Sequence, residues 1–268
     1  MGYPIAGKKV FITGASSGIG AGLARGLAAR GATVGICARR EAELAAVLAD
    51  CRRHAPASRM WRADLAQLDR LEALAARAWD ELGGIDVLIN NAGIPKRRVV
   101  TELTPAVVEQ VMAINFYSPV RLILALLPRM LAQRGGRIVN VSSVAARLGP
   151  PHEAAYSASK AALTAFSEGM AMDLCDLPVK VHVVNPAIID TPLFQLPDNE
   201  APISDEVQAL PVEAMVEAVL RQLDEDRFEV YVPESFAQYA AHRAKDIDGS
   251  IAGAKAWLRG KLAAGRKA

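Results

Sequence analysis

The sequence has little net charge and few cysteines. Lysine and arginine outnumber aspartate and glutamate by only 31 to 29, whereas a dedicated nucleic-acid-binding domain presents a clear excess of basic residues. The three cysteines, Cys37, Cys51 and Cys175, are odd in number and lack the spacing of metal ligands. They predict reduced thiols in a cytoplasmic protein. We therefore expect neither a nucleic-acid partner nor a metal site.

Signals for a membrane or for export are also missing. The segment Met1–Lys9 has no apolar core of a signal peptide. The apolar run Leu122–Leu127 has six residues, whereas a membrane-spanning helix needs about 20. These absences predict a soluble cytoplasmic protein without a membrane span.

The sequence is rich in apolar residues, and two kinds of apolar segment alternate along it. Hydrophobic residues make up 51% of the 268 positions, and short β-branched runs alternate with longer stretches of alanine and leucine. This rhythm predicts an α/β fold: a doubly wound, Rossmann-like parallel sheet of about seven strands, with helices on both faces, in a single domain over residues 1–268. The predicted strands are Lys9–Thr13, Thr33–Cys37, Arg59–Arg62, Val87–Asn90, Arg137–Val141, Lys180–Val184 and Glu229–Val232. The predicted helices are Ile19–Arg30, Glu41–His54, Leu68–Leu82, Thr104–Gln133, Ala154–Leu177 and Val212–Asp224.

The rhythm changes after the sixth predicted strand. Residues 190–212 are proline-rich and mixed in polarity, which predicts a mobile loop over the substrate. Residues 234–268 form a helical C-terminal tail with a basic end, for which an exposed helix is favoured over contact with acidic lipid.

A glycine-rich segment joins the first predicted strand to the first helix. Gly14, Gly18 and Gly20 lie within Thr13-Gly-Ala-Ser-Ser-Gly-Ile-Gly20. Glycine lets the backbone turn sharply and approach a phosphate, and the N-terminus of the following helix presents free N–H groups to it. The segment predicts a site for a dinucleotide pyrophosphate.

Three motifs in order resemble those of the short-chain dehydrogenase/reductase family. They are the glycine segment Thr13–Gly20, Asn90-Asn-Ala-Gly93 after the fourth strand, and Tyr156-Ser-Ala-Ser-Lys160. The resemblance runs from Lys8 to Thr191, and the joint occurrence of the motifs is far more specific than any one of them. It implies an oxidoreductase that transfers a hydride between a nicotinamide cofactor and a carbonyl or alcohol carbon.

The end of the second strand indicates which nucleotide is bound. An NAD enzyme usually carries an acidic residue there, but this chain has Arg39 and Arg40 before its first acid, Glu41. A guanidinium can bind a 2′-phosphate with paired hydrogen bonds, whereas a carboxylate would repel it. We therefore predict NADP(H) as the preferred cofactor, with NAD(H) possible in its place, Arg39 as the main phosphate ligand and Arg40 near the adenine. NADP-binding relatives often have a basic residue just before the middle glycine, where this chain has Ser17.

Tyr156 and Lys160 lie four residues apart on a predicted helix and so share one face. A free tyrosine has a pKa near 10, and a neighbouring ammonium and an oxidised nicotinamide would lower that pKa. Tyr156 could then donate or accept the proton of the reaction. The family resemblance implies that Lys160 also holds the nicotinamide ribose, that Ser143 hydrogen-bonds the substrate oxygen, and that Asn115 holds a water that links Lys160 to solvent. Strand alternation predicts that Ser142 points elsewhere.

The resemblance also implies the remaining cofactor contacts. Asp64 would bind the adenine amine, with a helix N-cap as the alternative, and Thr191 would bind the pyrophosphate or the carboxamide. Ala187 replaces the family's usual glycine. The complete predicted cofactor set is Gly14, Ser16, Ser17, Gly18, Ile19, Gly20, Arg39, Arg40, Asp64, Leu65, Asn91, Ala92, Gly93, Tyr156, Lys160, Pro186, Ile189 and Thr191.

Other functions remain open at this point. A catalytically silent NADP(H)-binding regulatory protein would not need Ser143, Tyr156 and Lys160, and an epimerase or dehydratase would tend to have a longer C-terminal region. A 3-oxoacyl thioester reductase of the same family is a further alternative. The apolar loop residues Leu193, Phe194, Leu196 and Ile203 predict an apolar ketone, aldehyde or alcohol as substrate.

Two further expectations concern the surface. The charged positions Lys96, Arg97, Arg98, His152 and Glu153 are predicted to be solvated loop residues. The long helices Val107–Gln133 and Ala154–Leu177 carry more apolar residues than one face needs, which predicts a homotetramer or homodimer.

Overall fold

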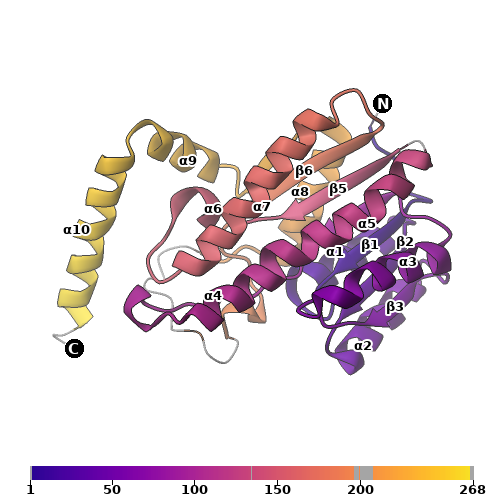
Figure 1. Ribbon diagram of the computed structural model, residues 1–268, viewed down its shortest axis with the longest axis horizontal. Coiled ribbons are helices and arrows are strands. Elements are labelled where there is room, and N and C mark those ends of the chain that lie inside the picture. Colours follow the sequence, from indigo (N-terminus) through magenta and orange to yellow (C-terminus); the bar gives the residue numbers. More distant parts are fainter. Residues whose placement is uncertain (1, 134, 196–198, 200–207, 266–268) are drawn as a thin grey trace.

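The structure is a computed structural model that describes residues 2–133, 135–195, 199 and 208–265. Seven parallel strands form one sheet in the order β3-β2-β1-β4-β5-β6-β7 (Figure 1). The strands are β1 (Lys9–Thr13), β2 (Thr33–Ala38), β3 (Arg59–Arg62), β4 (Val87–Asn90), β5 (Gly136–Val141), β6 (Val179–Pro186) and β7 (Glu229–Val232). This order confirms the predicted Rossmann-like sheet, and the direction of winding reverses between β1 and β4.

Helices cover both faces of the sheet. The helices of the described residues are α1 (Gly18–Ala28), α2 (Glu41–Arg52), α3 (Leu71–Leu82), α4 (Pro105–Met112), α5 (Ser118–Ala132), α6 (Ala145–Leu148), α7 (Ala154–Asp173), α8 (Val212–Glu225), α9 (Phe236–Lys245) and α10 (Ile247–Gly265). Successive residues of β1 point to opposite faces, as a pleated strand requires. Val10 and Ile12 pack into the core under α1, α2 and α8, and Phe11 packs into the core under α3 and α5.

The predicted helix Thr104–Gln133 is interrupted in its middle. A π segment, Ala113–Tyr117, separates α4 from α5, and such turns often occur at functional sites. By composition alone, the span Pro105–Ala132 is apolar enough to cross a membrane, and it is longer than the apolar run Leu122–Leu127. However, α5 packs against α3, β5 and β6, and Leu122, Ile123, Leu126 and Met130 of this helix are buried in the core.

The C-terminal tail is helical, as predicted, but it consists of two helices. In Figure 1, α10 stands apart from the sheet, beyond α9. Most residues of α10 are exposed, including Ile247, Ile251 and Trp257.

Candidate active site

One cavity lies at the carboxyl edge of the strands, where the sheet reverses its winding. Ligands of open α/β sheets bind at such switch points. All of the predicted cofactor residues except Gly20 line this cavity, and so do the predicted catalytic residues Ser143, Tyr156 and Lys160. Leu193 of the predicted substrate loop also lines it, and further lining residues that were not predicted are Ala38, Ala63, Ile94, Ile114, Val141, Ser142, Ala187 and Pro192. Apart from Ser142, these are apolar and carry no chemical signal in the sequence.

The glycine segment lies close against the loop that follows β4. Gly14 has a φ of 68°, and a Cβ on it would lie 2.7 Å from the Cα of Ala92. The Asn91 Nδ2 donates to the carbonyls of Thr13 (3.0 Å) and Gly14 (3.3 Å). Gly20 lies behind this loop, where a Cβ would come within 2.5 Å of Asn91 Nδ2. Gly20 therefore supports the loop from outside the cavity.

The two arginines after β2 lie at different places. Arg39 is exposed at the rim of the cavity. The Arg40 guanidinium reaches back to the glycine segment, where its Nη2 donates to Ser16 Oγ (3.1 Å) and Ser17 Oγ (2.5 Å). Arg40 was expected near the adenine, but these two hydroxyls hold it beside the glycine segment instead.

Asp64 forms a turn directly after β3. Its Oδ1 accepts a hydrogen bond from the backbone N of Ala66 at 3.1 Å. The helix N-cap predicted as the alternative role of Asp64 is not formed, because the next helical turn, Leu68–Arg70, has Gln67 as its N-cap residue. Asp64 and Leu65 both line the cavity, so the turn leaves them available to a nucleotide.

Ser143, Tyr156 and Lys160 come together from β5 and α7. The Ser143 Oγ accepts from the backbone N of Ala145 (3.1 Å) and donates to the carbonyl of Pro186 (3.5 Å), and its hydroxyl lowers the pKa of Tyr156. The Lys160 Nζ donates to the carbonyl of Val141 (2.8 Å) and lies 5.8 Å from the centroid of the Tyr156 ring. Ser142 faces α7, where its Oγ bonds to Thr164 Oγ1 at 2.8 Å, so it points away from Ser143 as predicted.

Burial dominates the protonation of both groups on α7. It raises the pKa of Tyr156, the Glu153 carboxylate raises it further, and the Ser143 hydrogen bond and Arg97 act in the opposite direction. Burial lowers the pKa of Lys160 to about 8. The protein groups alone therefore raise the pKa of Tyr156, because burial disfavours the phenolate. Lys160 is not among the causes of this shift, and the expected lowering by an oxidised nicotinamide stays a prediction.

Asn115 is buried in the π segment, just outside the cavity. Its amide exchanges two hydrogen bonds with the backbone of Ile94 (2.9 and 3.0 Å), and its Nδ2 donates to Ser159 Oγ (3.0 Å). A Cβ on Gly93 would lie 3.4 Å from both Asn115 Oδ1 and Lys160 Nζ. Asn115 is thus a neighbour of Lys160, and the glycine leaves the space between them free of side chain.

The charged loop residues near Tyr156 were not correctly predicted. The side chains of Arg97 and Glu153 are only 10% and 8% exposed and form an ion pair, with 2.6 Å between Arg97 Nε and Glu153 Oε1. The expectation of solvated positions is wrong for these two residues. They are 56 residues apart in the chain, and no local pattern indicates that they meet.

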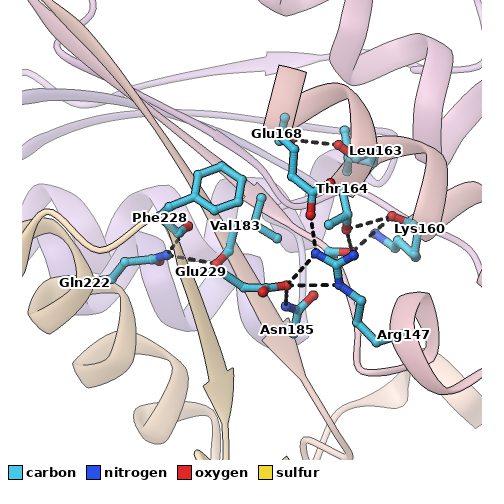
Figure 2. A network of polar contacts seen from close by, with 12 residues as sticks. Arg147, Lys160, Leu163, Thr164, Glu168, Val183, Asn185, Gln222, Phe228 and Glu229 are labelled. Atoms are coloured by element: carbon cyan, nitrogen blue, oxygen red, sulfur yellow. Dashed lines mark hydrogen bonds and ion pairs between the residues drawn. The ribbon is translucent and has the colours of Figure 1, made fainter. Parts of the chain in front are cut away.

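A network of polar side chains contacts α7 at Glu168 (Figure 2). Arg147 of α6 contacts Glu168 of α7 and Glu229 of β7, the latter at 3.2 Å. Asn185 of β6 donates to the same Glu229 carboxylate at 2.8 Å. This network therefore joins α6, α7, β6 and β7, and it meets α7 at Glu168.

Among the described residues, no group of three or more histidines, cysteines, aspartates and glutamates could hold a metal ion. The cavity instead combines backbone N–H groups, arginines and hydroxyls. These are the donors that bind phosphates and ribose.

Comparisons with known proteins agree with this geometry. A family profile described as short chain dehydrogenase matches residues 8–201. Nodulation protein G from a Rhizobium species is 30% identical over 255 residues, which cover 93% of this chain and 99% of that protein.

Two solved structures have the same fold over nearly their whole length. A short-chain dehydrogenase from Sphingobium yanoikuyae in complex with NADPH has a TM-score of 0.79 and 29% identity, and the match covers 93% of this chain and 95% of the other. A short chain dehydrogenase/reductase from Burkholderia phymatum in complex with NAD has a TM-score of 0.83 and 25% identity, over 92% and 96% of the two chains.

Proposed function

Because this chain belongs to the short-chain dehydrogenase family, we propose that it is an NADP(H)-preferring oxidoreductase that interconverts a carbonyl and an alcohol. The observation that carries the proposal is the meeting of Ser143, Tyr156 and Lys160 in the cavity that the glycine segment also lines. A bound nicotinamide would supply or accept the hydride. The chain's own residues would bind and orient the cofactor and the substrate, and would donate or accept the proton.

The residues at the glycine segment fit a dinucleotide. The N-terminus of α1 presents free N–H groups and the positive end of the helix dipole to a pyrophosphate. At Gly14 the backbone approaches Ala92 so closely that an added Cβ would collide with the Ala92 backbone. Thr191 lies beside Gly18, whose added Cβ would be 3.1 Å from the Thr191 side chain, and it would add a hydroxyl donor at the same place.

The arrangement of charges supports NADP(H) over NAD(H). Relatives that bind NADP often have a basic residue at the position of Ser17, and the Arg40 guanidinium occupies this place by bonding to the Ser17 hydroxyl. Arg39 stands exposed at the same rim. A 2′-phosphate between these two guanidinium groups would receive charge-assisted hydrogen bonds.

Three side chains would handle the proton and the substrate oxygen. Tyr156 would donate a proton to the developing alkoxide or take one from an alcohol, and Ser143 would hold the same oxygen by a hydrogen bond. Lys160 would bind the ribose hydroxyls and favour the phenolate. The raised pKa of Tyr156 keeps the phenol protonated at neutral pH, which suits reduction of a carbonyl.

The substrate is proposed to be apolar. Leu193 lines the cavity, while Leu196 and Ile203 of the predicted substrate loop lie outside the described residues. The mobile loop over residues 190–212 lies partly outside the described residues and stays a prediction, and the single domain over residues 1–268 also stays a prediction.

The test is a panel of ketones, aldehydes, secondary alcohols and 3-oxoacyl thioesters, assayed by NADPH absorbance with wild type and Tyr156→Phe. The variant should lose at least 100-fold in kcat, since general acid–base groups contribute about 10²–10⁴-fold, and should bind NADPH as before. Tyr239→Phe, which removes an exposed tyrosine hydroxyl on α9, is the matched control and should keep full activity. Equal turnover in the two variants would overturn the proposed role of Tyr156, whereas a wild type that turns over no member of the panel would favour a silent nucleotide-binding protein.

A further inference from the structure

A buried ion pair joins the loop after β4 to the start of α7, one helical turn before Tyr156. The Arg97 Nε lies 2.6 Å from Glu153 Oε1, and both side chains are about nine-tenths buried. Ion pairs at the surface contribute little, but removing one partner of a buried pair leaves an uncompensated charge in the protein. The two charges are therefore held in place together.

The pair lies where three segments meet. The backbone N of Arg97 donates to Asn199 Oδ1 (3.0 Å), and the backbone N of Arg98 donates to the carbonyl of His152 (2.8 Å). Glu153 is the N-cap residue of α7, but its carboxylate makes no capping bond to the helix. Its side chain pairs with Arg97 instead, so this carboxylate does not accept a hydrogen bond from the first backbone N–H groups of α7, as an N-cap side chain usually does.

The two charges act on the Tyr156 hydroxyl in opposite directions. Glu153 raises the pKa of the phenol and Arg97 lowers it, while the Ser143 hydroxyl also lowers it. The other charged group that faces the ring is Lys160, whose Nζ is 5.8 Å from the ring centroid. Burial raises the pKa of Glu153 itself, and Arg97 opposes this rise. As long as both partners are present, their effects on the phenol partly cancel.

We propose that Arg97 and Glu153 are positioning residues that hold two compensating charges at the start of α7, one turn before Tyr156, and so set the pH range in which the Tyr156 hydroxyl exchanges a proton. The inference rests on the proposed function, in which Tyr156 is the proton donor and acceptor. It adds a device from outside the family motifs, because neither residue lies within the three segments on which the resemblance was based.

The experiment titrates the Tyr156 phenol by its phenolate absorbance in the presence of saturating NADP⁺. Each protein is compared with the same protein carrying Tyr156→Phe, so that only Tyr156 contributes to the difference. Glu153→Gln should shift the midpoint to lower pH by roughly one unit, because it removes the carboxylate that disfavours the phenolate. Arg97→Met should shift it to higher pH by a similar amount, since Glu153 is ionised at the alkaline pH where a phenol titrates. The double variant should fall between the two.

Opposite shifts distinguish this role from a merely structural one. If both single variants shift the midpoint in the same direction, or if neither shifts it, the proposal is overturned. Arg97→Lys keeps the charge and should stay within a few tenths of a pH unit of wild type. A shift in Arg97→Lys as large as that of Arg97→Met would also overturn the proposal, and melting curves identify any variant that is not folded.

The titration needs no substrate, so its failure is distinguishable from failure of the proposed function. If the variants show opposite shifts but the wild type reduces nothing in the carbonyl panel, the proposed role of the charge pair stands and the proposed reaction fails. If the protein turns over substrate with a pH profile that neither substitution changes, the proposed reaction stands and the proposed role of the charge pair fails.

Discussion

At Lys160 the requirements of stability and of function oppose each other. Burial lowers the pKa of its ammonium from 10.5 to about 8, and one pKa unit corresponds to about 1.4 kcal/mol. The unfolded chain therefore binds this proton more tightly than the folded protein, and the full penalty, on the order of 3 kcal/mol, is present below about pH 8. It disappears as the pH rises from about 8 to above 10.5.

Lys160→Met should accordingly be more stable than wild type near neutral pH, although it loses activity and NADPH affinity. The gain is reduced to about 1 kcal/mol because the variant leaves the Val141 carbonyl without its donor. Urea unfolding measured near neutral pH and above the ordinary lysine pKa should show the advantage only at the lower pH. An equal destabilisation at both pH values would contradict this account of the buried ammonium.

Arg39 offers a test of the nucleotide preference at a single residue. Arg39→Asp replaces a cation by an anion at the rim of the cavity, and loss of one charge-assisted contact costs about 1.5–3 kcal/mol. NADPH binding should weaken by about 10- to 100-fold, with a relative gain for NADH in kcat/KM. Arg59→Asp makes the same change in charge at the exposed start of β3 and should leave the preference unaltered. A wild type that prefers NADH would contradict the proposal that Arg39 and Arg40 bind the 2′-phosphate of NADP(H).

At the scale of the elements, the network around Arg147 links α6, α7, β6 and β7 through side-chain contacts. Arg147→Met should lower the free energy of unfolding by about 1–3 kcal/mol, because two carboxylates lose a partly buried donor. It should also lower kcat, since α7 carries both Tyr156 and Lys160.

Arg129→Met is the control for the Arg147 prediction. It removes an ion pair with Asp80 whose side chains are 41% and 70% exposed, and exposed pairs contribute about 0–1 kcal/mol. Urea unfolding and kcat for the two variants should therefore separate clearly. If Arg147→Met behaves like Arg129→Met, the network contributes little to the position of α7.

At the scale of the whole molecule, exposed apolar residues on the long helix suggest how copies of the chain pair. Val108, Tyr117 and Leu124 are 36%, 49% and 57% exposed along α4, the π segment and α5. Pairing of this helix with its symmetry mate would bury them in an isologous contact. We keep the homodimer or homotetramer as a prediction on this ground.

Leu124→Glu should shift the assembly toward the monomer, because it would place two like charges in an apolar contact. Sedimentation equilibrium at micromolar concentration measures the effect. Ile251→Glu introduces the same charge on the exposed face of α10 and serves as the control. A wild type that sediments only as a monomer would refute the predicted assembly.

The sequence by itself determined the sheet, its helices and the members of the cavity. Strand and helix periodicities are local, and the glycine segment, the Asn-Asn-Ala-Gly motif and the Tyr156–Lys160 spacing are each contained within a few residues. In a parallel sheet the carboxyl ends of all strands meet at one edge, so residues at the ends of strands are brought together by topology alone. For this reason nearly every predicted cofactor residue lines the cavity.

The tertiary structure alone decided the contacts between charges and the protonation of the buried groups. Arg40 meets Ser17 across 23 residues and Arg97 meets Glu153 across 56, and no periodic pattern connects such pairs. The pKa of Tyr156 depends on how deeply α7 is buried and on which charges face the ring, neither of which has a local signature in the sequence. Electrostatic interactions depend on distance in space and on exclusion of water, and packing settles both of these.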